Sequence, residues 1–164
     1  MVDRWEEARN EEQEKAGNVD LLSKFVLLYS TYINTPRDYG TGQLMSMVEV
    51  HVLADIYENP GITVTELARR WRRTKGAISQ TVSKLEEKGF IHREKEQTDA
   101  KVIHLYVTIQ GEELCNAHRA YDDIHIAETM DILLQECTMA DIKSFHKVMA
   151  AFVNRLGESS LSDR

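Results

Sequence analysis

Two short helices that are followed directly by a β-hairpin constrain the fold of this chain most. The segments TVTELARRW and TKGAISQTVSKLEEKG each begin with a helix start signal and lie close together. Thr63 and Glu66 have the spacing of a capping box, in which a hydroxyl and a carboxylate each accept a hydrogen bond from a free backbone N–H group. Thr74 can cap the second helix, and Gly89 stands where a left-handed C-terminal cap belongs. This order predicts a helix-turn-helix unit.

The segment after Gly89 predicts a wing, so that the unit becomes a winged helix-turn-helix domain. FIHREKE and KVIHLYVTI, at residues 90–96 and 101–109, are typical of strands, and QTDA between them is a turn signal. In such a domain the second helix enters the major groove of DNA. Its inner side must then be aliphatic, and Ile78, Val82 and Leu85 meet that need at helical spacing.

The outer side of the second helix is small, polar and uncharged. Gly76, Ser79, Gln80 and Ser83 share this side of a helix that turns about 100° per residue. A glutamine can pair with adenine through two hydrogen bonds, and a serine can contact several bases. A solvent-facing helix usually carries pairs of Glu and Lys instead. The outer side therefore favours the reading of DNA bases over simple exposure to solvent.

The charge distribution points in the same direction as this polar face. The net charge of −7 argues against a nucleic-acid partner when it is taken alone. However, the segment from Leu67 to Leu85 contains six Lys and Arg residues and no acidic residue. A basic patch on an acidic body is typical of proteins that bind a polyanion. On charge alone, a solvated basic face is the alternative.

Amphipathic helices flank this unit on both sides. Helices are expected over 19–33 and 43–58, with a loop over 34–42, then over 109–136 and from Thr138 onward. Their apolar sides are expected at Leu22, Phe25, Tyr29 and Tyr32; at Leu44, Val48, His51, Val52 and Ile56; and at Ile142, Phe145, Met149, Phe152 and Leu156. The first and last of these sets are more than a domain of this size can cover. Pairing between the first and last helices of two chains would bury them.

The expected fold class is mainly α with a small β-hairpin wing. The expected organisation is a polar N-terminal segment (1–17), an N-terminal dimerisation helix (18–36), a winged helix-turn-helix domain (43–108), C-terminal dimerisation helices (109–157) and a tail (158–164).

Composition excludes several other classes of protein. The chain has no run of 18 apolar residues, which argues against a membrane span, and its acidic N-terminus is unlike a signal peptide. Cys115 and Cys137 form no CxxC pair, so a reducing, cytoplasmic setting is expected. Nucleotide-binding loops and metalloprotease motifs are missing from the sequence, and no enzymatic activity is expected.

The stretch from Thr63 to Leu114 resembles the core of the MarR family of bacterial transcription regulators. The resemblance rests on the ELA helix start, the TKGAISQTVSKLEEKGFI recognition helix, the arginine after it, and the Asp-x-basic wing tip before VIHLYVT. It covers about residues 44–115, and the outer helices match by order and length. It implies a homodimer that binds a pseudo-palindromic double-stranded operator, usually as a repressor. It also implies that an effector releases the DNA.

The resemblance assigns DNA-contacting roles residue by residue. The major-groove surface would consist of Thr74, Lys75, Gly76, Ser79, Gln80, Ser83 and Lys84. Arg93 would steady the root of the wing or touch a phosphate. At the wing tip, Lys101 replaces the family's usual arginine, and a phosphate contact is expected there because lysine lacks the planar fork of arginine. Glu94 and Glu96 weaken the attraction of this wing for DNA.

The turn of the helix-turn-helix departs from the family pattern. Arg72 and Arg73 stand where the family often has a glycine and an aliphatic residue. Both are expected to make additional contacts with the DNA backbone.

A possible sensing site lies on the long helix after Thr108. Cys115, His118, Asp122 and His125 share one side of it, and the second helix offers His51. His51, His118 and Asp122 resemble the placement of ligands in the family's zinc-sensing branch, and these residue types bind zinc. The histidine pattern also resembles the branch that controls fatty-acid synthesis, whose effector is an acyl chain on acyl carrier protein. A cysteine redox sensor, another small organic ligand, and plain hydrogen-bonded interior histidines are the other interpretations.

The leading hypothesis is thus a dimeric, sequence-specific DNA-binding repressor that requires no cofactor. The alternative is a winged-helix protein-interaction module without a DNA role. The uninterrupted basic segment and the slim polar face of the second helix favour the first.

Overall fold

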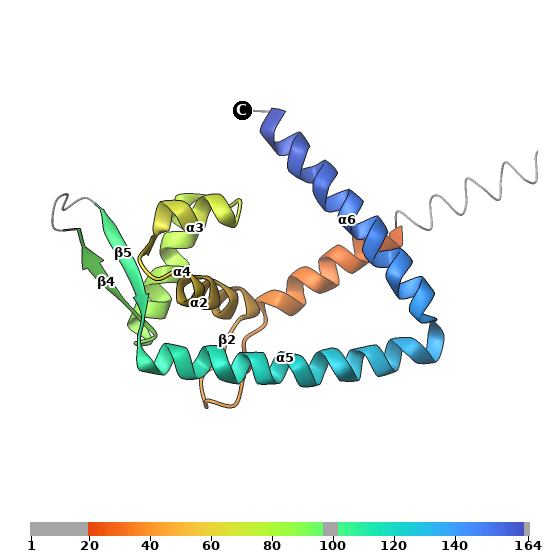
Figure 1. Cartoon of the computed structure of the whole chain (residues 1–164), viewed down its shortest axis with the longest axis horizontal. Coiled ribbons are helices and arrows are strands. Elements are labelled where there is room, and N and C mark those ends of the chain that lie inside the picture. The colour runs from red at the N-terminus through yellow and green to blue at the C-terminus, as the bar shows by residue number, and fades with distance from the viewer. Residues whose placement is uncertain (1–19, 97–101, 163–164) are drawn as a thin grey trace, which may run out of the picture. The chain divides into compact units, whose positions relative to one another are not determined.

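The structure is a computed structural model and describes residues 20–96 and 102–162, with side chains as far as residue 157. After a helix over residues 20–34, the elements are β1 (Arg37–Asp38), β2 (Leu44–Met45), α2 (Met47–Glu58), β3 (Ile62–Thr63), α3 (Val64–Arg70), α4 (Lys75–Glu87), β4 (Ile91–Lys95), β5 (Ile103–Val107), α5 (Ile109–Glu136) and α6 (Met139–Ser162) (Figure 1). The expected fold class, mainly helical with a small β wing, is confirmed. The chain divides into two compact units, with the boundary after Arg119 inside α5.

The two helices of the helix-turn-helix begin at the predicted caps. At α3, the Thr63 hydroxyl accepts a hydrogen bond from the backbone N–H of Glu66 at 3.3 Å. The Glu66 carboxylate in turn accepts from the N–H of Thr63 at 2.8 Å, which completes the capping box. At α4, the Thr74 hydroxyl accepts from the N–H of Ala77 at 3.2 Å.

Helix α4 ends as its glycine predicts. Gly89 has a φ of +77°, the left-handed conformation that glycine adopts without a Cβ clash. Its N–H donates to the carbonyl of Glu86, and the N–H of Phe90 donates to the carbonyl of Leu85, both at 2.9 Å. This pair of bonds is a Schellman motif, which satisfies the last carbonyls of the helix and directs the chain into β4.

The wing is a three-stranded antiparallel sheet in the order β3-β5-β4. Strands β4 and β5 pair over their full length, with Ile91 opposite Val107 and Lys95 opposite Ile103. The sequence predicts this hairpin but not β3, where Ile62 pairs with Leu105 at the other edge of β5. A strand of two residues is too short to show alternation, so it carries no periodic signal.

The loop expected over 34–42 is partly structured. Strands β1 and β2 pair there, with Arg37 opposite Met45. Between them the Asp38 carboxylate accepts hydrogen bonds from the backbone N–H groups of residues 40 to 42 at 2.9–3.0 Å. The turn therefore depends on one aspartate and is more ordered than the glycine-rich sequence indicates.

Helix α2 is shorter than expected, and its inner side is different. It begins at Met47 rather than 43, because Ser46 and Glu49 form a capping box there. Val52 and Ile56 are buried as predicted, whereas Leu44 lies in β2 with 63% of its surface exposed and His51 is exposed. Val48 is half-buried. Val50 and Leu53 are buried as well, which places them on the inner side of α2.

The core of the winged domain joins α2, α3, α4, the wing and the start of α5. Its largest fully buried side chains are Met45, Leu53, Ile56, Leu67, Ile78, Leu85, Leu105 and Leu114. The predicted inner face of α4, Ile78, Val82 and Leu85, is confirmed. Gly111 has no room for a Cβ, because the carbonyl of Phe90 and the side chain of Val107 occupy that space. This close approach lets α5 begin directly behind the wing.

The N-terminal helix carries an exposed apolar side within the single chain. Phe25, Tyr29 and Tyr32, predicted for that side, are all exposed, and their rings stack in sequence at centroid distances of 5.6 and 6.2 Å. Leu22 is exposed as well.

Helix α6 shows the same property. It begins with the predicted cap, where the hydroxyl of Thr138 accepts from the N–H of Asp141 at 3.3 Å. Phe145, Phe152 and Leu156 are exposed, and Ile142 and Met149 are half-buried. The helix continues to Ser162, so most of the expected tail is helical. Among the helices that the structure describes, none is long and apolar enough to cross a bilayer.

Candidate nucleic-acid interface and histidine cluster

The outer side of α4 lies on the surface, where a nucleic acid could reach it. Thr74, Lys75, Gly76, Gln80 and Lys84 are exposed, and Ser79 and Ser83 are half-buried. A methyl group at Gly76 would meet no atom within 4 Å beyond its chain neighbours and its own helix backbone, so open space lies beside this glycine. The face is slim at its N-terminal end, as an approach to base edges requires.

Arg93 joins the wing to α4. From β4, one guanidinium nitrogen donates to the Ser83 hydroxyl at 3.1 Å. Its Nε lies 3.1 Å from a carboxylate oxygen of Glu86, which makes an ion pair without hydrogen-bond geometry. Of the two predicted roles for Arg93, these contacts support the steadying of the wing root. They also fix the hydroxyl of Ser83, one of the residues predicted to contact bases.

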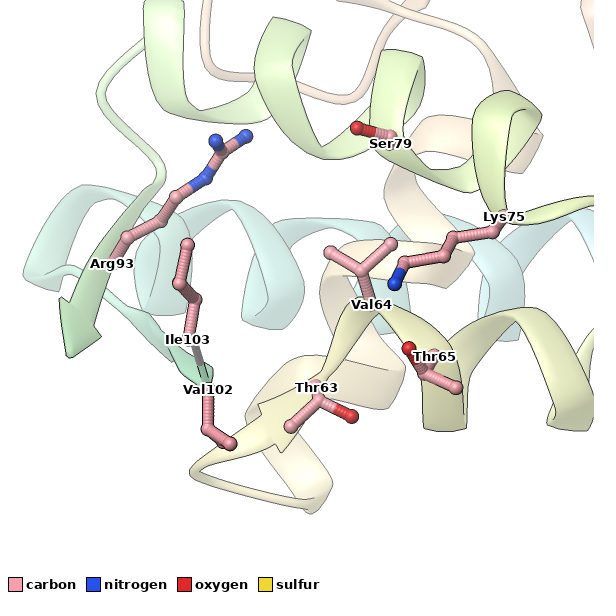
Figure 2. Close-up of a pocket in the computed structure, with 8 residues that line it drawn as sticks. All are labelled: Thr63, Val64, Thr65, Lys75, Ser79, Arg93, Val102 and Ile103. Carbon is pink, nitrogen blue, oxygen red and sulfur yellow. The ribbon is translucent and has the colours of Figure 1, made fainter. Parts of the chain in front are cut away.

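A hollow of about 340 Å³ lies between the start of α3, helix α4 and the wing strands. Its lining consists of Thr63, Val64, Thr65, Lys75, Ser79, Arg93, Val102 and Ile103. Figure 2 shows Lys75 and Thr65 converging on one side of it and Arg93 on the other. Two cationic side chains and several hydroxyls around one concave surface suit a phosphate group. Sequence reasoning missed Thr65, although the capping box at Thr63 places it in the first turn of α3.

The turn between α3 and α4 contains a strained arginine. Arg72 has a φ of +49°, which a residue with a Cβ adopts at a cost of about 1–2 kcal/mol. This is the position where the resembling family often has glycine, and the backbone explains that preference. The side chains of Arg72 and Arg73 are both exposed. They lie beside the N-terminus of α4.

A carboxylate on α2 holds the end of α3 in place. Asp55 accepts hydrogen bonds from the indole N–H of Trp71 at 2.9 Å and from Nε of Arg70 at 3.1 Å. A second guanidinium nitrogen of Arg70 lies 2.7 Å from the other carboxylate oxygen, which also accepts from Asn59 at 3.0 Å. Trp71, the residue that follows α3, is half-buried, and its indole N–H has an acceptor. The role of Asp55 was not predicted.

The wing tip residues Asp99, Ala100 and Lys101 lie outside the described residues, so the predicted contact of Lys101 stays a prediction. The two wing glutamates each lie against a histidine: Glu94 is 3.1 Å from His92, and Glu96 is 2.7 Å from His104. Hydrogen bonds to Glu96 and then to the Gly61 carbonyl raise the pKa of His104 above its usual value.

The predicted sensing residues meet beside α2. His118 is buried, with 4% of its surface exposed, and its ring packs edge-on against Tyr39 and His51 at centroid distances of 4.8 and 5.0 Å. Asp122 follows one turn later on the same helix. A potential ligand atom from each of His51, His118 and Asp122 lies within 4.8 Å of the others. Two imidazoles and a carboxylate are a donor set that suits zinc.

The other members of the predicted stripe do not join this cluster. His125 pairs with Glu128 along α5 at 3.0 Å. Cys115 is buried, and burial raises the pKa of its thiol to about 11. A thiol that stays protonated near neutral pH is a poor nucleophile, which argues against the redox interpretation.

The capped helix pair, the three-stranded wing and the exposed polar face of α4 define a winged helix-turn-helix domain. Residues 45–103 match the model of the MarR family. The uncharacterized HTH-type transcriptional regulator YhjH of Bacillus subtilis (strain 168) is 31% identical over 84 residues, which cover 51% of this chain and 48% of that protein. The match thus spans about half the length of this curated relative.

Solved structures show the same fold over most of the chain. The crystal structure of MarR is 28% identical, covers 85% of this chain and 90% of that one, and has a TM-score of 0.63. FabT of Streptococcus pneumoniae, solved in complex with DNA, is 18% identical, with coverages of 90% and 98% and a TM-score of 0.63. The winged helix domain of this chain is therefore similar to that of the MarR family. This is a family of transcription regulators and not of enzymes.

Proposed function

We propose that this chain is a sequence-specific DNA-binding regulator of transcription that places α4 in the major groove. The observation that carries the proposal is the division of α4 into two faces. Its aliphatic residues are buried, whereas its outer side is slim and uncharged, with Gly76 and Gln80 exposed and Ser79 and Ser83 half-buried. Lys75, Lys84 and the arginines of the α3–α4 turn surround that face and supply phosphate contacts.

The hollow beside Lys75 extends this surface toward the wing. A backbone phosphate entering it would lie between the ammonium of Lys75 and the guanidinium of Arg93, near the hydroxyl of Thr65. Such contacts fix the register of a protein on the duplex and leave sequence reading to α4.

The functional unit of the proposal is a homodimer. The apolar sides of the N-terminal helix and of α6 are exposed in the part of the chain that the structure describes, and a second copy is the occupant we propose. Two α4 helices related by a twofold axis would read a pseudo-palindrome with half-sites about one helical turn, roughly 34–36 Å, apart. Repression in the cytoplasm, by occupation of a promoter, is the regulatory mode we propose.

A metal ion is the effector that the histidine cluster favours. His51 and His118 supply imidazole nitrogens, and Asp122 supplies a carboxylate, so zinc could be held at this place and change the affinity for DNA. An acyl chain delivered by acyl carrier protein, or another small organic ligand, is the competing proposal.

Selection of duplexes from a random pool tests the DNA-binding proposal. We expect enrichment of a twofold-symmetric site and an affinity that falls with salt as phosphate contacts release counterions. If no duplex is enriched and binding to DNA is absent at low salt, the protein-interaction module becomes the better explanation.

Titration of the bound duplex with zinc, and separately with acylated acyl carrier protein, tests the effector. A response to zinc that His118→Ala abolishes supports the metal. A response only to the acylated protein supports the acyl chain. No response to either leaves His118 as a packed interior group and His51 as its surface neighbour.

A further inference from the structure

The charge of the wing depends on a histidine. In the described part of the wing, from Ile91 to Glu96 and along β5, Arg93 and Lys95 offset Glu94 and Glu96. A proton on His104 therefore adds a positive charge to the surface that this part presents to a polyanion. Histidine is the side chain that changes charge near neutral pH.

Each of the two glutamates that weaken the attraction of the wing for DNA lies against a histidine side chain. Nε2 of His92 lies 3.1 Å from Glu94, between two exposed side chains. Nε2 of His104 lies 2.7 Å from Glu96 and is better shielded from water, because only 26% of its side chain is exposed. A pair that is partly shielded is screened less by salt than an exposed pair.

His104 has an acceptor at both ring nitrogens. Nδ1 lies 2.6 Å from the carbonyl oxygen of Gly61, and Nε2 faces the carboxylate of Glu96. A carbonyl oxygen cannot donate, so Nδ1 must carry a hydrogen. If Nε2 also donates to the carboxylate, the ring is an imidazolium. If the proton between Nε2 and the carboxylate is assigned to Glu96 instead, His104 and Glu96 together still hold the same number of protons.

The charged groups that act on His104 come from three directions. Glu96 follows β4, Glu94 stands opposite His104 in the β4–β5 register, and Glu66 of α3 adds a weaker attraction. Arg69 in turn lies near Glu66 and lowers the pKa of that carboxyl group, although less than the hydrogen bonds from Thr63 do. The rise in the pKa of His104 means that this ring keeps its proton to a higher pH than an ordinary histidine and loses it as the pH rises through the raised pKa.

His104 also ties three segments together. Its backbone lies in β5, its Nδ1 holds the turn before β3, and its Nε2 holds the end of β4. Loss of the proton removes one of the two side-chain bonds and leaves the charge of Glu96 uncompensated. Loss of the bond makes the wing less ordered, and the charge of Glu96 repels phosphates. Both consequences oppose the approach of the wing to DNA.

We propose that protonated His104 positions the wing and neutralises Glu96 for DNA binding, so that the affinity for DNA falls as the pH rises through neutrality. The inference rests on the proposed DNA-binding function. By this inference, the strength of the contact between the wing and DNA depends on pH, and His104 is a positioning residue.

Two measurements on the full chain test this inference. NMR titration of the ring carbon-bound protons, without DNA, gives the pKa of His104. Affinity for the duplex enriched from the random pool is then measured between pH 6.5 and 8.5 at fixed salt. We expect the wild type to lose about three- to tenfold in affinity, because a pKa difference of one unit between the free and bound protein corresponds to tenfold. The salt slope should be steeper at the lower pH by up to about 0.9, the value for one additional cation on a phosphate.

Matched variants separate His104 from the other histidines. Glu96→Gln removes the negative partner at a half-buried position, and it should lower the pKa of His104 and remove most of the pH dependence. His104→Gln should do the same if it folds. His92→Gln, which deletes the other wing histidine, should retain most of the wild-type profile.

An unchanged pH profile in Glu96→Gln would overturn the inference while leaving DNA binding intact. So would a pKa for His104 that lies at or below the ordinary histidine value. Failure to bind any duplex at pH 6.5 would instead overturn the proposed function, and this inference with it.

Discussion

Helix α4 and the wing are built on the same core, but they carry different kinds of charge. Around α4 the cations are lysines and arginines, residue types that keep their charge through the physiological pH range. On the described wing, lysine and arginine are balanced by glutamates, and a proton on His104 adds a positive charge. If the proposed function holds, one domain combines a permanent DNA contact with one that depends on pH. The following predictions test the permanence of α4 and the conditional character of the wing.

The largest effect is expected in the core that supports α4. Leu85 is fully buried, so Leu85→Ala should lower the free energy of unfolding by about 2–5 kcal/mol, through lost burial and the cavity that remains. Urea denaturation at a fixed protein concentration measures this. Ile103→Ala, at a half-buried position of β5, is the wing counterpart and should cost less. An equal loss at both positions would contradict the view that α4 is the more firmly packed element.

The reading of bases should be a property of α4 alone. Gln80→Ala should weaken binding of the enriched duplex by about 1–3 kcal/mol and relax the preference at one base position. Lys84→Ala should instead weaken all duplexes alike and flatten the salt slope by about 0.9. Competition binding with the enriched and a random duplex measures both. A uniform loss in Gln80→Ala would show that this residue does not read sequence.

The clamp at the end of α3 should contribute less than the core. Asp55→Ala leaves the indole N–H of Trp71 and the guanidinium of Arg70 without their acceptor, which should cost about 1–3 kcal/mol of stability. The lower part of this range is expected because Arg70 is half exposed to water. Asp55→Asn retains one acceptor oxygen and should lose less in the same denaturation experiment. A larger loss of stability in Asp55→Asn than in Asp55→Ala would show that Asp55 does not stabilise the protein as a hydrogen-bond acceptor.

The smallest effect is expected at the strained turn. Arg72→Gly relieves a left-handed backbone that costs about 1–2 kcal/mol of stability. Glycine also lowers the stability by about 0.5–1 kcal/mol, because it makes the unfolded chain more flexible. The stability should therefore stay within about 1 kcal/mol of the wild type.

Arg72→Ala is the matched control, since it also lacks the guanidinium but keeps the strain. Both variants should lose the same DNA affinity, and Arg72→Gly should be the more stable of the two in thermal unfolding. Different affinities would mean that the backbone, and not the guanidinium, governs the contact.

Local signals made most of this domain predictable. The caps at Thr63, Thr74 and Gly89, and the buried face of α4, depend on residues a few positions apart, which a sequence displays directly. The start of α2 was misplaced although the same kind of signal was present: Ser46 and Glu49 have capping-box spacing. That box competes with the apolar Leu44, and the cap prevails because it satisfies free N–H groups.

Contacts between distant segments were not predictable. Asp55 meets Trp71 across two elements, and His104 meets the carbonyl of Gly61 across 43 positions. No periodicity encodes such pairs, because they depend on how finished elements pack. The gathering of His51 and His118 was suggested by a family resemblance, and spacing along one helix placed His118 and Asp122 on a shared side. The packing of His118 against both Tyr39 and His51 came from the structure alone.

The short strand β3 has a consequence for how the domain opens. Its pairing with β5 joins Ile62 to Leu105, and the N–H of Gly61 donates to the same Leu105 at 2.9 Å. The chain between these positions contains both helices of the helix-turn-helix, so the sheet closes a loop around them. Partial unfolding that frees α4 must then break the sheet or the core. The amides of α4 and the central strand should exchange with solvent as one cooperative unit, at rates set by opening of the entire winged domain.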